Sequence, residues 1–241
     1  MRRQIPNILT LLNLFSGCVA CVMAFNGEFL LVFVWIIVAA IFDFFDGFAA
    51  RLLKVTSPLG VQLDSLADVV SFGVAPAMAV FALLSHYMGM LPTLGLFSHT
   101  TVQLLIPYLA FLLPMFAAYR LGKFNIDERQ TTSFLGLPTP ANGLFWVSYV
   151  YGMQYVEGNV EWLTARVLLL VVLFSWLMVS EIPMFSLKLK QLKVKGNERQ
   201  LILIVLALVF VGVWQLSGVA YLILSYIAIS ILTMRKDKSI R

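Results

Sequence analysis

Long apolar stretches recur from one end of this 241-residue chain to the other, and 61% of its residues are hydrophobic against 12% charged. A soluble domain has a far more even balance. Each stretch is long enough for a helix to cross the roughly 30 Å hydrocarbon layer of a bilayer. The expected spans are approximately 8–25, 29–51, 60–85, 102–122, 139–156, 163–185 and a final run, 200–234.

The final run decides how many spans there are. As one straight helix, the 35 residues of 200–234 would extend roughly 50 Å, too long for one crossing at ordinary tilt. The segment Gln215-Leu216-Ser217-Gly218 therefore predicts a tight turn between two short helices. We expect an all-α, polytopic membrane helical bundle with eight transmembrane helices, built as a single membrane domain over residues 1–241 with short loops.

Charge predicts the orientation of this bundle. With eight spans and a cytoplasmic N-terminus, 16 of the 17 basic residues fall on the cytoplasmic side, as the positive-inside tendency requires. Seven spans would put the basic C-terminal tail outside, so both termini are expected in the cytoplasm. The net charge of +5 is then a topology signal with some attraction to anionic lipid, and it gives little reason to expect nucleic acid.

Four aspartates interrupt two of the apolar stretches. Asp43 and Asp46 are three residues apart, and Asp64 and Asp68 are four apart, so each pair shares one face of a helix. Each carboxylate costs roughly 2.5–3.5 kcal/mol at the bilayer centre, so something must compensate the set. Because the loop around residue 54 is short, the two helices of this hairpin, at about 29–85, should be antiparallel neighbours whose acids converge in a cavity open to the cytoplasm.

Carboxylates alone suit Mg²⁺ or Mn²⁺, and two such cations would neutralise four of them and still attract a diphosphate. Gly47 and Ala50 share the acidic face and leave room for a bulky substrate, while Arg51 can donate two hydrogen bonds to phosphate. Two other readings remain: polar contacts that join helices, and a pathway for cations or protons.

The pattern Asp43-x-x-Asp46-Gly47-x-x-Ala50-Arg51, followed by Gly60-x-x-x-Asp64-x-x-x-Asp68, resembles the complete signature of the CDP-alcohol phosphatidyltransferase family. The resemblance implies that Asp43, Asp46 and Asp64 bind metal and that Asp68 is both a ligand and the general base. It also implies that the CDP group is received by Gly47, Ala50, Arg51 and Gly60. The N-terminal segment 5–10 resembles the family's entry segment, which suggests nucleotide contacts by Pro6, Asn7 and Thr10.

Three further segments, 63–76, 119–125 and 134–141, resemble the phosphatidylserine synthase branch of that family. This resemblance implies transfer of a phosphatidyl group from CDP-diacylglycerol to L-serine with release of CMP, and homodimers. Serine carries a carboxylate and an ammonium, and we expect Arg120 or Lys123 to hold the carboxylate and Asn125 to add a hydrogen bond.

Other acceptors and a different class of protein remain possible from the sequence. Glycerol 3-phosphate or inositol phosphate could replace serine, and a cation transporter would also carry acids in its membrane helices. Direct attack and a covalent phosphatidyl-enzyme both stay open. The segment 136–140 is rich in backbone-restricting residues and predicts a rigid helix entry. Substrate contact by Thr139 or Asn142 beside it stays open as well.

Overall fold

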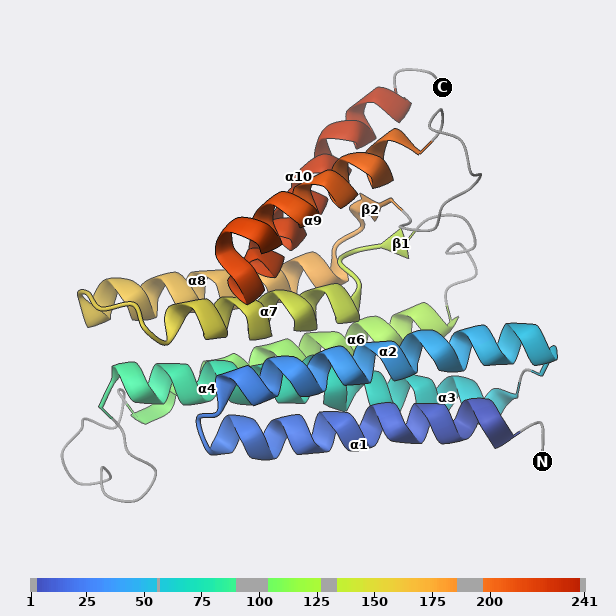
Figure 1. Ribbon diagram of the computed structural model, residues 1–241, viewed down its shortest axis with the longest axis horizontal. Helices are drawn as coiled ribbons and strands as arrows, with labels where there is room; N and C mark the ends of the chain where they lie inside the picture. The colour runs from blue at the N-terminus through green and yellow to red at the C-terminus, as the bar shows by residue number, and fades with distance from the viewer. Residues whose placement is uncertain (1–3, 56, 90–103, 127–133, 186–196, 239–241) are drawn as a thin grey trace.

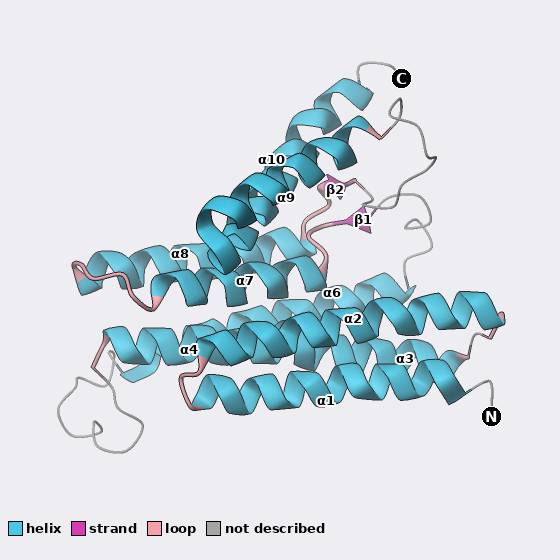
Figure 2. Cartoon of the chain, viewed as in Figure 1, coloured by secondary structure: helices cyan, strands magenta, loops and turns pink. Residues whose placement is uncertain are grey.

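The computed structural model describes residues 4–55, 57–89, 104–126, 134–185 and 197–238, and nearly all of them are helical (Figure 2). The elements, in chain order, are α1 (Ile5–Phe25), α2 (Phe29–Leu53), α3 (Pro58–Asp68), a π-helical segment (Val69–Val74), α4 (Ala75–Tyr87), a 3-10 segment (Ile106–Phe111), α6 (Leu112–Ile126), β1 (Phe134–Leu135), α7 (Thr139–Met153), α8 (Val160–Val179), β2 (Pro183–Met184), α9 (Glu198–Trp214), a second 3-10 segment (Gln215–Ser217) and α10 (Gly218–Lys238). The two short strands pair antiparallel, with Phe134 opposite Met184.

The helices α1 to α8 run along the long axis of the molecule, and the pair α9 and α10 leans away from them at an angle (Figure 1). α1 packs against both α2 and α3. The N-terminus, the connection between α2 and α3 and the C-terminal end of α10 all lie toward the same end of the bundle (Figure 1). The connection between the acid-bearing helices α2 and α3 therefore lies at the end of the bundle where α1 begins and α10 ends.

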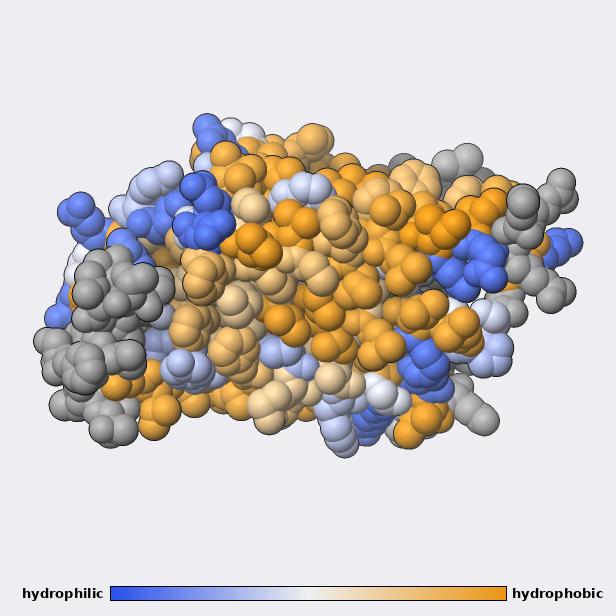
Figure 3. Space-filling model, turned by 90° about the horizontal axis from the view of Figure 1, so that it is seen from below, coloured by the Kyte–Doolittle hydropathy of each residue, from blue (hydrophilic) through white to orange (hydrophobic). Residues whose placement is uncertain are grey.

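Five helical segments in the described residues are long and apolar enough to cross a membrane. They are Ile5–Phe25, Phe29–Leu53, Pro58–Tyr87, Val160–Val179 and Glu198–Thr233. One broad face of the molecule is mainly apolar in its middle, and hydrophilic residues gather toward the two ends (Figure 3). The predicted all-α membrane architecture is found, while eight crossings and cytoplasmic termini stay predictions.

The last of these segments reverses direction inside its length, as the sequence predicts. α9 ends at Trp214, Gln215 takes a positive φ of 51°, and α10 begins at Gly218. A Cβ atom at Gly218 would overlap the backbone around Phe210, so this turn requires glycine. Ser148 on α7 fastens the turn, because its hydroxyl donates to the Leu216 carbonyl at 2.7 Å and accepts from the Ala220 amide at 2.8 Å.

A π-helical segment follows the last aspartate of α3. Pro76, at the start of α4, has no N–H to donate to the preceding turn, and the helix widens just before it. Close packing surrounds the widened segment on two sides: Gly73 lies against α6, where an added Cβ would be 3.2 Å from Pro114 Cα, and Gly143 of α7 lies against Phe72. α6 and α7 are thus both held against the segment that begins next to Asp68.

Candidate active site

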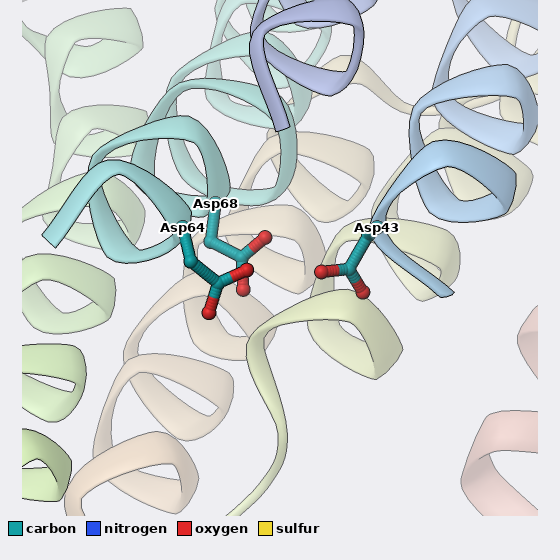
Figure 4. Close-up of side chains that lie close together, drawn as sticks. All are labelled: Asp43, Asp64 and Asp68. Carbon is teal, nitrogen blue, oxygen red and sulfur yellow. The ribbon is translucent and has the colours of Figure 1, made fainter. Parts of the chain in front are cut away.

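Three of the four predicted aspartates form a compact cluster. Asp43 projects from α2, Asp64 and Asp68 project from α3, and the carboxylates point toward one another across the space between the helices (Figure 4). One oxygen from each lies within 4.8 Å of the others. Asp68 is 7% exposed, and Asp43 and Asp64 are half-buried. The two helices run antiparallel. α2 directly contacts the continuation of α3, namely the π-helical segment and α4, and α1 packs against both α2 and α3.

The fourth aspartate, Asp46, lies beside this cluster and outside its 4.8 Å group. It is 5% exposed, and its Oδ2 accepts a 2.6 Å hydrogen bond from the hydroxyl of Thr10 on α1. Together with Asp64 it lines the cavity next to the cluster. Its place between cluster and cavity follows from the three-residue spacing, which puts Asp46 almost one turn nearer the α2–α3 loop than Asp43.

Asn13 on α1 is a site residue that the sequence reasoning missed. Its side chain is fully buried, and Nδ2 donates to Asp68 Oδ1 at 3.3 Å. Ser71 in the π-helical segment in turn donates to the Asn13 carbonyl at 3.0 Å. The available signal was spacing: Pro6, Thr10, Asn13 and Gly17 stand at i, i+4, i+7 and i+11, a polar and small face on an otherwise apolar helix.

A cavity of about 410 Å³ lies beside the acids, between α1, α2 and α3. Its walls include every residue predicted to receive the CDP group except Arg51, namely Pro6, Asn7, Thr10, Gly47, Ala50 and Gly60. Four wall residues were not predicted, namely Lys54, Val55, Ser57 and Val61. Lys54, Val55 and Ser57 belong to the α2–α3 connection and Val61 to the first turn of α3, where the family-like pattern has unspecified positions.

Two residues of the cavity wall are glycines, and neighbouring groups pack closely against both. A Cβ at Gly60 would lie 3.2 Å from Asn7 Oδ1, so glycine there lets α1 approach α3 closely. Gly47 lies under the exposed Arg51 side chain, whose Nη1 would be 3.4 Å from an added Cβ. Arg51 thus folds back along α2 over Gly47. At the rim, Lys54 takes a left-handed conformation with a φ of 52°, unusual for a residue with a side chain.

The three residues predicted to bind serine all belong to α6 but differ in their surroundings. Arg120 on α6 is 7% exposed, its Nε has no hydrogen-bond partner, and it is close enough to Asp68 for electrostatic interaction. Lys123 lies nearer the surface, with its Nζ 3.7 Å from the Glu181 carboxylate. Asn125 is exposed and donates to the Ser65 hydroxyl at 2.9 Å. Of the three, Arg120 alone is directed into the protein near the acids.

The donor set of the cluster fits a hard divalent cation. Every ligand atom is a carboxylate oxygen, which suits Mg²⁺ or Mn²⁺ and gives no reason to expect zinc. Across the described residues, no ion pair with lysine or arginine balances the three acids. Buried charges of one sign are costly without a partner, so a bound cation is the compensation that this arrangement calls for.

Comparison with known proteins places these features in a class. The family model described as CDP-alcohol phosphatidyltransferase matches residues 3–177, which include every acid of the site. The chain belongs to the CDP-alcohol phosphatidyltransferase family. Its apolar helices and this membership make it an integral membrane protein of the transferase class.

Curated relatives are similar over most of the chain. Proteins named CDP-diacylglycerol–serine O-phosphatidyltransferase from two strains of Helicobacter pylori are each 35% identical over 214 residues, covering 86% of this chain and 81% of their own. The protein of that name from Bacillus subtilis is 32% identical over 149 residues, covering 61% of this chain and 76% of its own. The resemblance drawn from the signature is therefore confirmed.

Proposed function

We propose that this protein synthesises phosphatidylserine, transferring the phosphatidyl group of CDP-diacylglycerol to the hydroxyl of L-serine and releasing CMP. The observation that carries the proposal is the cluster of Asp43, Asp64 and Asp68 beside a cavity lined by the residues of the family signature. The names of the curated relatives support serine as the acceptor.

The aspartates would hold Mg²⁺ or Mn²⁺, with Asp43, Asp64 and Asp68 as the primary ligands and Asp46 at the side of the cavity. A divalent ion bound there would offset negative charge on the diphosphate as it is cleaved. Two divalent ions per site would supply the four positive charges that balance the four carboxylates. The cavity walls would take the CDP group, with Gly47, Ala50 and Gly60 allowing close approach and Arg51 reaching phosphate from the exposed side.

Asp68 is proposed to take the proton from the serine hydroxyl. The serine oxygen then forms a bond to the phosphorus that carries diacylglycerol, while the bond from that phosphorus to the oxygen of CMP breaks. Asn13 holds the Asp68 carboxylate in a fixed orientation for this step. Arg120 would bind the serine carboxylate, because a buried guanidinium with an unpartnered N–H is suited to a carboxylate. Lys123 and Asn125, which lie nearer the surface, would contact serine at the rim of the site.

We further propose that the site faces the cytoplasm, where serine and CMP are soluble, and that the acyl chains stay in lipid between helices. The exposed apolar surface of the helices supports an acyl environment next to the cavity. The family resemblance supports a homodimer.

The test is CMP release by purified protein given CDP-diacylglycerol, Mg²⁺ or Mn²⁺, and one acceptor at a time. We expect release with serine and far less with glycerol 3-phosphate or inositol phosphate. Release with a phosphorylated acceptor and none with serine would contradict the choice of acceptor. Ion flux in proteoliposomes without any CMP release would instead support a cation transporter.

A further inference from the structure

Three polar atoms at the start of α7 are buried without hydrogen-bond partners. They are the hydroxyl oxygen of Thr139 and both the Oδ1 and Nδ2 atoms of Asn142, and both residues are 0% exposed. Buried polar groups in proteins are nearly always paired, because leaving one unpaired costs the free energy of removing it from water. A fully buried amide with neither end satisfied calls for a polar ligand.

Helical geometry gives the direction in which Asn142 points. Gly143 faces the π-helical segment, where an added Cβ would be 3.0 Å from Phe72 Cα, and Phe145 faces α8, with its ring 3.9 Å from that of Phe174. A rotation of about 100° per residue places Asn142 between these two directions. α6 occupies that side, because it packs against both the π-helical segment and α8. Thr139, one turn earlier, lies on the same side.

The facing surface of α6 carries Arg120. α6 meets the π-helical segment at Ala117, where an added Cβ on Gly73 would be 3.3 Å away, and Arg120 follows three residues later. α6 and α7 run in opposite directions (Figure 1). Arg120 follows Ala117 on α6 and Thr139 precedes Gly143 on α7, so both lie toward the end of the π-helical segment that adjoins Asp68. A buried cation with a free N–H thus lies across from a buried amide and a buried hydroxyl, all near Asp68.

We propose that Thr139 and Asn142 bind the amino-acid acceptor opposite Arg120. Arg120 takes the carboxylate, and the Thr139 and Asn142 oxygens accept hydrogen bonds from the ammonium group. The amide N–H of Asn142 can add a second donor to the carboxylate, so the set matches a small zwitterion. This inference rests on the proposed function and adds to it the residues that select an α-amino acid.

The test replaces each polar group by an apolar one of similar size, Thr139→Val and Asn142→Leu, in the full-length protein. We expect the KM for serine to rise about tenfold or more, as for loss of a hydrogen bond to a charged group, with the KM for CDP-diacylglycerol unchanged. Thr139→Ser keeps a hydroxyl and should retain the serine KM within about threefold.

Thr164→Val is the matched control. Thr164, on α8, also has a buried and unpartnered hydroxyl, but it lies near the start of α8, which follows the end of α7, whereas Thr139 lies at the start of α7. Removing such a hydroxyl should not lower Tm in either threonine variant, and only Thr139→Val should weaken the rise in Tm that serine produces in the presence of CDP-diacylglycerol.

The outcomes separate the two claims. Wild-type protein that does not use serine overturns the proposed function. Wild type that uses serine, together with Thr139→Val and Asn142→Leu variants of unchanged serine KM, overturns this inference alone and assigns the two side chains to buried water. Equal effects of Thr139→Val and Thr164→Val on serine KM would overturn it as well.

Discussion

The hydroxyl of Thr10 on α1 donates a 2.6 Å hydrogen bond to the carboxylate of Asp46 on α2. α1 also donates to Asp68 on α3 through Asn13, so one apolar helix orients acids on both arms of the hairpin. α1 is therefore part of the site and not only its lipid-facing cover.

Thr10→Val removes the donor to Asp46 and keeps the side chain's shape. Because Asp46 and Thr10 both line the cavity, we expect the KM for CDP-diacylglycerol to rise about tenfold, as for a hydrogen bond to a charged group. Steady-state CMP release at varied lipid and fixed serine measures it. Thr10→Ser should behave like wild type, and a Thr10→Val variant with normal kinetics would mean that the contact has no role in lipid binding.

Asn13→Leu leaves Asp68 without its amide donor. If Asn13 orients the general base, kcat should fall at least about tenfold while the KM for CDP-diacylglycerol changes little, because the cavity walls remain in place. Single-turnover CMP release separates this effect from product dissociation. A variant that loses lipid affinity at unchanged kcat would assign Asn13 to binding instead.

Gly17→Ala tests how closely α1 must approach the π-helical segment. The added methyl would lie 2.8 Å from Ser71 Cα, a backbone atom that cannot move aside cheaply. We expect a loss of about 1–3 kcal/mol in stability, seen as a lower Tm in detergent. Gly212→Ala on α9 is the control, because nothing lies within 4 Å of its Cβ position, and its Tm should not fall. Equal Tm values for the two variants would rule out tight packing at Gly17.

Divalent cation should stabilise the protein through the acid cluster. We expect Mg²⁺ or Mn²⁺ to raise the Tm of wild type, since a ligand that binds the folded state stabilises it, and EDTA to abolish CMP release. Asp64→Asn should lose most of the rise in Tm. Glu181→Gln removes a carboxylate that pairs with Lys123 outside the cluster and should keep the rise. An undiminished shift in Asp64→Asn would place the ion elsewhere.

Much of the prediction depended on the spacing of residues that are near one another in the sequence. Asp64 and Asp68, four residues apart, can only share a helix face, and the polar break at Gln215 in an over-long apolar run can only be a reversal or a kink. Both inferences depend on near neighbours in sequence, and the structure contains the acid cluster and the turn between α9 and α10.

Contacts between distant segments could not be read in this way. The ion pair of Lys123 with Glu181 joins α6 to the segment that follows α8, and a lone lysine at a helix end gives no sign of such a partner. The sequence alone does not distinguish an Asn13 that only joins two helices from an Asn13 that donates a hydrogen bond to a catalytic acid. The packing of α1 against both α2 and α3 likewise depends on how three helices come together.

The most direct measurement is CMP release by Asp68→Asn protein supplied with CDP-diacylglycerol, Mg²⁺ and serine. Asparagine keeps the size of the side chain and cannot accept the proton, so we expect the rate to fall at least about 100-fold while CDP-diacylglycerol still binds. An Asp68→Asn protein that turns over at the wild-type rate would contradict the account.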